Sequence, residues 1–393
     1  MRWLLALILL WPALATADWL AAMQAYEKAD YATARAGFEK LLPLGNAQAA
    51  FNLAAMAYQG QGQSADNVSA VAYFAYAGYL GHVEADSLRQ KISKTLSAEQ
   101  LHQAEQLSMR LQQSLKIPPL TACNKQADES LVAECGMTAE TSPAAAISTV
   151  IPKYPSGAAR YGITGYVRMR FLLDAYGKVQ VVDFLDSFPR KVFDREAKRA
   201  LLKFEYAPVG TAGIRTIQFD FTLDSGGGIT PQLLLAQLEK HNLWVYAIAG
   251  SQQHQEALGT FLSLLKKYSP NKLAVDPAAV LDPANPDWSV FSTPASVNDN
   301  QQFVAIPEMF SEIFWWRQAA KNGDYEAQRI LSSFDQRWRD YLIEQEDAEV
   351  MAWYGADLVI NGDIERGVAL LDKAIAAGYG NGKDLKSALL GKK

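Results

Sequence analysis

The sequence is poor in the residues that metal-dependent and nucleophilic catalysis use most. Its 393 residues include two cysteines and four histidines, which are His82, His102, His241 and His254. No two histidines have the i, i+4 spacing beside a glutamate that zinc metalloproteases require. A Gly-x-Ser-x-Gly elbow is absent, and Ser225-Gly226-Gly227-Gly228 lacks the lysine and Ser/Thr of a phosphate loop. We therefore expect no enzyme activity, no metal site and no cofactor, and keep an unrecognised cell-wall hydrolase as the catalytic alternative.

An excess of positive charge is also missing. The chain carries 37 basic and 42 acidic side chains, for a formal net charge of -5. This balance gives no general attraction to nucleic acid or to anionic lipid headgroups. A hydrophobic content of 49% and a charged content of 20% are ordinary for a globular chain of two or three domains.

Long apolar runs are limited to the N-terminus. Arg2 is followed by the apolar stretch Trp3–Leu14, which Pro12 interrupts, and Ala15-Thr16-Ala17 offers a small-residue cleavage site before Asp18. The stretch is shorter than the ~20 residues that cross a bilayer as a helix. The pattern predicts a cleaved signal peptide at residues 1–17, export to the periplasm and no transmembrane helix in the mature chain. An uncleaved inner-membrane anchor is the alternative.

The two cysteines, Cys123 and Cys135, lie close together in a segment rich in proline and alanine. In an oxidising compartment, such a pair without histidine at metal-ligand spacing favours a disulfide that closes a short loop. Two buried free thiols are the alternative, whereas a redox-active pair lacks its usual Cys-x-x-Cys spacing. We interpret residues 116–147 as a linker that contains this pair.

The segment before this linker has helical periodicity and nearly repeats itself. Leu44–Ala49 recurs as Leu80–Ala85, which is a spacing typical of stacked helix-turn-helix units. This segment resembles a Sel1-like repeat, a relative of the tetratricopeptide repeat (TPR), and the residues that carry the resemblance are Asn52, Leu53, Met56, Tyr58, Gly60, Gly62, Ala70, Phe74, Ala77, Gly78, Gly81 and Ala85. Similar punctuation returns at Phe314–Asp324 and at Ala369–Gly378, which predicts degenerate repeats near the C-terminus.

The middle of the chain reads differently. Tyr166–Leu172 alternates as a half-buried strand, Asp174–Gly177 is a turn, and Val179–Val182 continues as the second strand of a hairpin. Phe193–Phe204 has helical spacing, and Thr216–Leu223 alternates strictly with its apolar residues inward. These elements predict a small α+β domain in which a three-stranded sheet packs on helices.

This middle segment resembles the C-terminal domain of TonB proteins. The resemblance covers about a fifth of the chain and follows the family's order of features. The residues that carry it are Tyr154, Pro155, Gly162, Gly165, Asp174, Gly177, Phe193, Asp194, Arg195, Tyr206 and Pro208. Most of these positions also have structural reasons, because glycine suits turns and proline ends helices. The motif therefore identifies a fold more firmly than it identifies a contact residue.

The resemblance implies a mode of binding. Domains of this family accept a short extended segment of an outer-membrane transporter, the TonB box, as an added strand at the sheet edge. Carried onto this sequence, the edge strand runs from Ile214 to Leu223. The residues we assign to partner binding are Ile214, Thr216, Gln218, Asp220 and Thr222. The alternative is an ordinary solvated sheet surface.

The resulting reading is a fold of class α + (α+β), with helical repeats, or α-solenoids, flanking the TonB-like domain. The segments are the signal peptide 1–17, Sel1/TPR-like repeats 18–115, the linker 116–147, the TonB-like domain 148–224 and the helical domain 225–393. TonB proteins have a membrane anchor and a proline-rich spacer and end near the last strand. This chain differs, because its N-terminal segment is predicted to be cleaved and a helical domain at residues 225–393 follows the TonB-like domain. We therefore expect a periplasmic adaptor for protein partners in TonB-dependent transport or envelope assembly, with partners among outer-membrane transporters or a TonB-system complex. The alternative is an anchored energy transducer.

Overall fold

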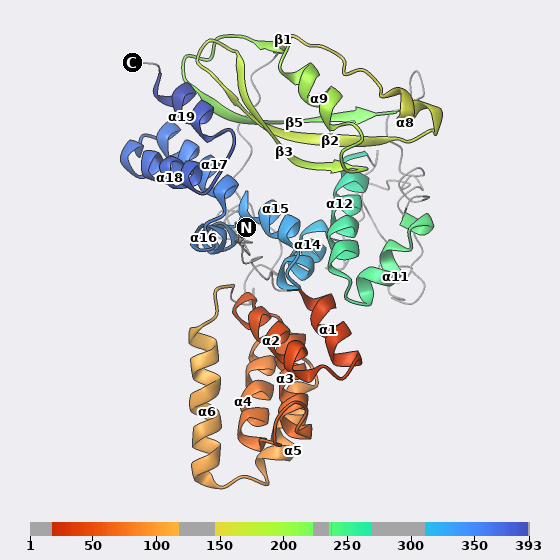
Figure 1. Ribbon diagram of the computed structural model, residues 1–393, viewed down its shortest axis with the longest axis vertical. Coiled ribbons are helices and arrows are strands. Elements are labelled where there is room, and N and C mark those ends of the chain that lie inside the picture. Colours follow the sequence, from red (N-terminus) through yellow and green to blue (C-terminus); the bar gives the residue numbers. More distant parts are fainter. Residues whose placement is uncertain (1–17, 118–145, 223–235, 237, 269–310, 392–393) are drawn as a thin grey trace, which may run out of the picture. The chain divides into compact units, whose positions relative to one another are not determined.

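The chain is mostly helical and contains one small α+β domain (Figure 1). The computed structural model describes residues 18–117, 146–222, 236, 238–268 and 311–391. The chain divides into two compact units, which are described separately. The first unit holds the N-terminal helices together with Tyr246–Glu256 and Arg317–Ala327, and the second holds the sheet and the C-terminal helices.

The N-terminal helices of the first unit pack mainly with their neighbours in sequence. They are α1 (Trp19–Glu27), α2 (Tyr31–Leu41), the 3-10 turn η1 (Leu42–Leu44), α3 (Ala47–Gln59), α4 (Asn67–Tyr79), α5 (Ala85–Ser93) and α6 (Ala98–Gln113). The side chains of Asp18, Asp30, Asn46 and Asp66 each accept a hydrogen bond from a backbone N–H of the helix that follows. Such caps satisfy donors that the first turn of a helix leaves unpaired. Polar residues before apolar runs therefore fix where these helices begin.

Buried aromatic and aliphatic side chains fill the space between these helices. Phe38, Leu53, Met56 and Tyr76 are fully buried. The Tyr76 hydroxyl donates to the Leu42 carbonyl at 2.9 Å, which satisfies its polar end inside the core. Phe74 and Tyr76, two aromatic residues of α4, thus belong to the core.

A chain of buried amides connects segments of the first unit that are distant in sequence. Asn46 Nδ2 donates to the Lys321 carbonyl at 3.1 Å and to Asn322 Oδ1 at 2.8 Å. Asn322 Nδ2 in turn donates to Gln255 Oε1 at 2.8 Å. All three amide side chains are at least nine-tenths buried. Because a buried amide without partners is costly, this chain of bonds holds the three segments in one arrangement.

In the second unit, the sheet is antiparallel and has the order β3-β2-β5. It consists of β2 (Gly165–Leu173), β3 (Val179–Phe188) and β5 (Gly213–Phe221), and the short strands β1 (Ala146–Ser148) and β4 (Glu205–Tyr206) pair separately. The helices α8 (Ser156–Arg160) and α9 (Asp194–Leu201) lie between strands in sequence. The predicted three-stranded sheet on helices is confirmed.

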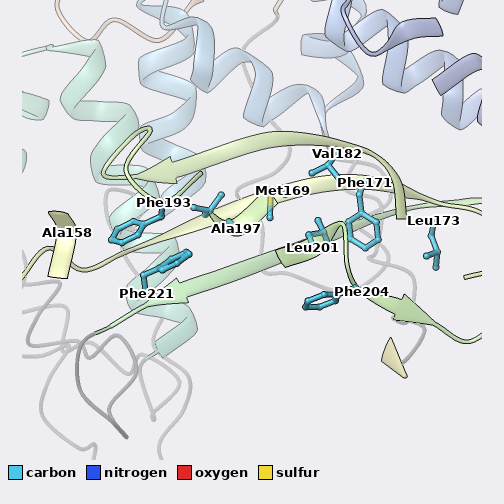
Figure 2. Close-up of a cluster of buried hydrophobic side chains, with 11 residues drawn as sticks. Ala158, Met169, Phe171, Leu173, Val182, Phe193, Ala197, Leu201, Phe204 and Phe221 are labelled. Atoms are coloured by element: carbon cyan, nitrogen blue, oxygen red, sulfur yellow. The ribbon is translucent and has the colours of Figure 1, made fainter. Parts of the chain in front are cut away.

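One face of this sheet and α9 enclose a core of aromatic and aliphatic residues (Figure 2). Phe193 stacks on Phe221 with ring centroids 4.3 Å apart, and Met169 and Leu201 are fully buried in the same cluster. Residues of β2 at alternate positions face this core, as the period of a strand requires.

Residues on the other side of β2 and β3 pack against helices near the C-terminus. In sequence, the helices after the sheet are α11 (Leu243–Ile248), α12 (Gln252–Tyr268), α14 (Glu312–Lys321), α15 (Tyr325–Ser332), α16 (Gln336–Glu344), α17 (Ala348–Ile360), α18 (Ile364–Ala376) and α19 (Gly382–Leu390), and the strands pack against the last three. Leu172 and Val181 share a buried cluster with Met351, Trp353 and Leu385. Both faces of the sheet therefore contribute to a core.

Several predictions concern residues outside the described ranges. The signal peptide 1–17, most of the linker, and the pair Cys123 and Cys135 belong to this group. The described helices of the N-terminal and C-terminal regions agree with the predicted helical character, while their assignment to a repeat class stays a prediction. Among the described helices, none combines the length and the apolar character needed to cross a bilayer.

His82, which precedes α5, is held as a neutral imidazole. Its Nδ1 lies 3.3 Å from the Glu84 backbone N–H, its Nε2 lies 3.1 Å from Gln48 Oε1, and its ring stacks on Phe51 at 4.0 Å. With Nδ1 accepting, Nε2 carries the proton and donates to Gln48. Desolvation by burial lowers the pKa of His82, and the nearby Glu84 opposes this shift.

We predict that His82 contributes stability at neutral pH that is lost on acidification. Because its pKa is lower in the folded than in the unfolded chain, the unfolded chain binds more protons as the pH falls below about 6.5. His82→Gln should therefore lose less thermal stability than the natural chain between pH 7.5 and 5.5. NMR titration of the ring should give a pKa below 6.5 for His82, and a value at or above 6.5 would contradict the prediction.

Candidate functional site

The last strand of the sheet is its candidate binding edge. Among the described strands, the order is β3-β2-β5, so β5 pairs with β2 and lies at the edge of the described sheet. Thr216 and Asp220 are exposed, and Gln218 and Thr222 are half-buried. Ile214, by contrast, packs against the cluster that contains the C-terminal helices. The structure thus places four of the five predicted contact residues on an accessible strand and directs the fifth inward.

The alternate residues of β5 lie on the side of α9. Ile217 and Phe219 are half-buried against the core, and Phe219 meets Phe204 edge-on with centroids 5.6 Å apart. Arg215 is on the same side, where β2 places Phe171 opposite it. This side of the edge strand therefore combines one cation with two apolar side chains, a combination that the sequence pattern did not single out.

Two glycines of the predicted motif are required by close backbone contacts. A Cβ added to Gly165 would lie 1.8 Å from the Phe188 carbonyl oxygen, at the end of the β2–β3 pair. Gly177 has φ +83, and a Cβ there would lie 2.0 Å from the Tyr206 carbonyl oxygen. Gly162 has φ +63 in the turn before β2. Because no larger residue fits the first two positions, these glycines set the geometry of the domain.

The remaining motif residues build turns and the core. Asp174 Oδ1 accepts from the N–H groups of Tyr176 and Lys178 at 2.9 Å each, which closes the β2–β3 turn. The Tyr154 hydroxyl donates to the Ile163 carbonyl, and the Tyr154 ring lies 5.5 Å from Phe193. None of these contacts leaves a side chain aimed at a ligand.

At the start of α9, the motif residues differ in exposure. Asp194 is the first residue of the helix, and its Oδ1 has no hydrogen-bond partner among the described residues. Arg195 is 81% exposed and pairs with the buried Glu196 at 3.1 Å. Tyr206 belongs to β4 and is half-buried, whereas Pro208 follows in an exposed loop. Exposed Arg195 is the one motif residue with a solvent-facing charge in this helix turn.

Arginines on the central strand have carboxylate partners on the opposite face of the sheet. Arg168 Nη2 lies 2.5 Å from Asp186 Oδ2. Arg170 Nη2 lies 3.1 Å from Glu349 Oε1 on α17, and Arg329 on α15 pairs with the same carboxylate. Charged residues that alternate with apolar ones along a strand usually face solvent. On this strand, Arg170 instead contacts a helix that is far away in the sequence.

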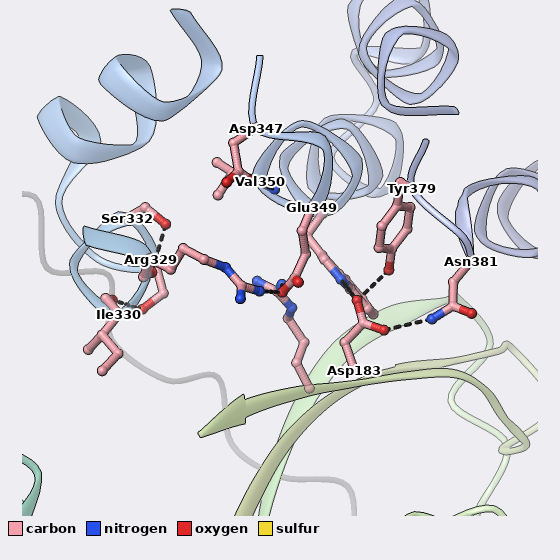
Figure 3. A network of polar contacts seen from close by, with 12 residues as sticks. Asp183, Arg329, Ile330, Ser332, Asp347, Glu349, Val350, Tyr379 and Asn381 are labelled. Carbon is pink, nitrogen blue, oxygen red and sulfur yellow. Dashed lines mark hydrogen bonds and ion pairs between the residues drawn. The ribbon is translucent and has the colours of Figure 1, made fainter. Parts of the chain in front are cut away.

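The buried carboxylate of Asp183 on β3 is the centre of these contacts (Figure 3). It accepts from Trp353 Nε1 at 2.8 Å, from Asn381 Nδ2 at 2.7 Å and from the Tyr379 hydroxyl. The Arg170 guanidinium stacks on the Trp353 ring, 4.4 Å from its centroid. Three hydrogen bonds and a nearby cation compensate the burial of this charge.

The burial of Asp183 and its contacts determines the ionisation of Arg170 and Tyr379. Burial lowers the pKa of Arg170 to about 10, and the charge of Asp183 opposes that shift. Burial also raises the pKa of the Tyr379 hydroxyl, and the charge and hydrogen bond of Asp183 add to the rise. At neutral pH, Tyr379 is therefore a neutral donor and Arg170 is a cation, so the site is a fixed set of donors around one carboxylate.

No group of three or more His, Cys, Asp or Glu side chains that could hold a metal ion occurs among the residues that the structure describes. The carboxylate of Asp183 is engaged by three donors and does not face a free ligand. On β5, the side chains of Thr216 and Asp220 are exposed to solvent.

We predict that Asp183→Ala lowers the free energy of unfolding of the second unit by about 3–5 kcal/mol, because it leaves three buried donors without their acceptor and removes the negative charge that favours the buried Arg170 cation. Tyr379→Phe, which removes one donor, should cost about 1–2 kcal/mol. Urea unfolding measures both values, and hydrogen exchange should locate the loosened amides in α17 and α19.

The matched control for this prediction is Asp384→Ala, which removes an exposed carboxylate from the first turn of α19. Its cost should stay below about 1 kcal/mol. Equal costs for Asp183→Ala and Asp384→Ala would show that the buried carboxylate has no special role.

Comparison with known proteins shows which family this domain resembles. Residues 151–223 match the family model described as the Gram-negative bacterial TonB protein C-terminal. The chain is 34% identical over 74 residues to protein TonB of Yersinia enterocolitica, which is 19% of this chain and 29% of that protein. It is 35% identical over 85 residues to protein TonB of Klebsiella pneumoniae, which is 21% of this chain and 35% of that protein.

A solved structure is also similar to part of this chain. The solution NMR structure of the Pseudomonas aeruginosa TonB C-terminal domain has 28% sequence identity and a TM-score of 0.20, and the match covers 21% of this chain and 89% of that structure. The chain thus spans about a third or less of the full-length TonB proteins that it matches. Residues 151–223 of this chain form a TonB C-terminal domain.

Proposed function

We propose that this protein is a periplasmic adaptor that binds an extended segment of an outer-membrane transporter as a fourth strand beside β5. The observation that carries the proposal is the position of β5 at the edge of the sheet of a TonB C-terminal domain. An edge strand presents main-chain N–H and C=O groups that another strand can pair with. The side chains of Thr216, Gln218, Asp220 and Thr222 would then contact the partner, beside the inward-facing Ile214.

The regularity of the pairing favours β5 over β3 as the acceptor. β5 pairs with β2 in continuous register from Gly213 to Phe221. The pairing of β3 with β2 shifts register at Arg168/Met169 and again at Phe171/Leu173. Such irregularities twist an edge away from a regular partner strand. β3 also has neighbours beside it, since Phe188 contacts Phe261 of α12 at 5.3 Å and Asp183 contacts Asn381.

The covered faces of the sheet support the same assignment. Helix α9 buries one face, and the cluster with α17 and α19 buries part of the other. A partner that approached either face would have to displace helices with their buried side chains. Pairing at β5 needs no such rearrangement, and main-chain hydrogen bonds would supply its affinity.

The rest of the architecture has a separate role in this proposal. The helical regions would hold a second envelope protein, as stacked helical hairpins present extended binding surfaces. Cleavage of residues 1–17 would release the chain into the periplasm, with Cys123 and Cys135 forming a disulfide in the linker. Retention of the N-terminus in the inner membrane would instead favour the energy transducer. The catalytic alternative, an unrecognised cell-wall hydrolase, would need a cleft that holds ionisable groups with shifted pKa values.

We predict that a cysteine at Thr216 forms disulfides with a TonB-box peptide in a pattern with a period of two residues. Thr216 is exposed on β5, and in paired strands only alternate side chains lie on the same face. Peptides carrying one cysteine at each successive position would be oxidised with full-length Thr216→Cys, and the products quantified by mass spectrometry.

The control variant is Val83→Cys, because Val83 is 92% exposed and lies in the first unit. It should react weakly and without periodicity. A flat profile at Thr216, or equal yields at Thr216 and Val83, would count against strand pairing at β5.

A further inference from the structure

The three arginines within the sheet strands differ in how their charge is compensated. On the central strand, Arg168 pairs with Asp186 and Arg170 pairs with Glu349. Arg215 on β5 forms no ion pair with any carboxylate among the described residues, and its Nη1 donates a hydrogen bond to the Ile214 carbonyl at 3.0 Å. Its Nε is buried and lacks a partner within the described part of the chain. A half-buried cation without a carboxylate is thus left on the edge strand.

The position of this guanidinium depends on Gly213. A Cβ added to Gly213 would lie 2.9 Å from Nη1 and 3.3 Å from Cζ of Arg215. The guanidinium therefore lies over the bare backbone of Gly213, two residues back on the same side of the strand. Tyr206 is close enough for the cation to oppose the rise that burial causes in the pKa of its hydroxyl. The absence of a side chain at Gly213 thus allows the guanidinium of Arg215 to lie close to the backbone of the edge strand β5.

The neighbours of Arg215 on the same side of β5 are apolar. Ile217 and Phe219 follow at alternate positions and are half-buried. A strand added beside β5 places its own alternate side chains next to these three residues, whether it runs parallel or antiparallel. An added strand that complements these three residues would have an anionic side chain beside Arg215 and apolar side chains beside Ile217 and Phe219.

We propose that Arg215 selects, among extended segments that pair with β5, those with a carboxylate side chain at the position beside it and apolar side chains at the next two alternate positions. This inference rests on the proposed strand pairing. A carboxylate there would accept charge-assisted hydrogen bonds from a guanidinium that already has lost part of its hydration. Main-chain pairing supplies affinity for many sequences, and Arg215 supplies the discrimination among them.

The test uses full-length protein and short synthetic peptides. One peptide carries a glutamate followed at every second position by two valines, with threonines between, and another has the reversed order, so that both strand directions are covered. In matched peptides, glutamine or lysine replaces the glutamate. Binding is measured by fluorescence anisotropy with the natural chain, Arg215→Gln and Arg215→Glu, with Arg195→Gln as a control for an exposed cation on α9.

In at least one direction, the glutamate peptide should bind the natural chain roughly tenfold more tightly than the glutamine peptide, as expected for one charged hydrogen-bonded pair. Arg215→Gln should abolish this preference, Arg215→Glu should favour the lysine peptide, and Arg195→Gln should change neither. Gly213→Ala, which displaces the guanidinium, should weaken the preference. The comparison of peptides on the natural chain needs no variant to fold.

Two negative outcomes have different meanings. If glutamate and glutamine peptides bind equally and still cross-link to Thr216→Cys with a period of two, strand pairing stands and the role of Arg215 is wrong. If no peptide binds or cross-links, the proposed strand pairing fails and the selection by Arg215 fails with it.

Discussion

The arrangement of the second unit depends on the burial of one carboxylate, Asp183, between the sheet and the helices near the C-terminus. A buried charge is unfavourable unless donors surround it, and here Trp353, Tyr379 and Asn381 supply them from α17 and from the segment before α19. Removing either side of this contact would leave unpaired polar groups on the other. The TonB C-terminal domain and the helices that follow it are therefore coupled, because neither provides a satisfied surface alone.

This coupling determines which parts of the sheet remain available. With α9 on one face and the cluster around Leu172 on the other, the main-chain edges are where a partner can approach without displacing a core. Of the two edges, β3 has an irregular register and carries Asp183, whereas β5 is regular along its length. The same contact that stabilises the second unit thus leaves β5 as the regular edge at which we propose strand addition.

Much of this organisation could be predicted from local patterns. Strict alternation predicted the last strand, helical spacing predicted α9, and separated glycines predicted turns that the close contacts of Gly165 and Gly177 now explain. The second strand was predicted only as far as Val182, because the irregularity in β3 interrupts its alternation, although the strand runs to Phe188. Asp183 and Arg170 were missed, since polar residues alternating on a strand look alike whether they face water or helices some 170 residues away. Ile214 was assigned to the partner-facing set for the same reason.

Specificity at such an edge needs a feature other than the main chain. Main-chain pairing accepts almost any extended segment, so discrimination has to come from side chains beside the edge. On the central strand, the charges of Arg168 and Arg170 are already compensated by carboxylates of this chain. Arg215 differs because Gly213 gives its guanidinium a fixed position while the described part of the chain provides no carboxylate for it. Since a fixed cation loses little freedom when it binds, selection by charge is strongest at this position on the sheet.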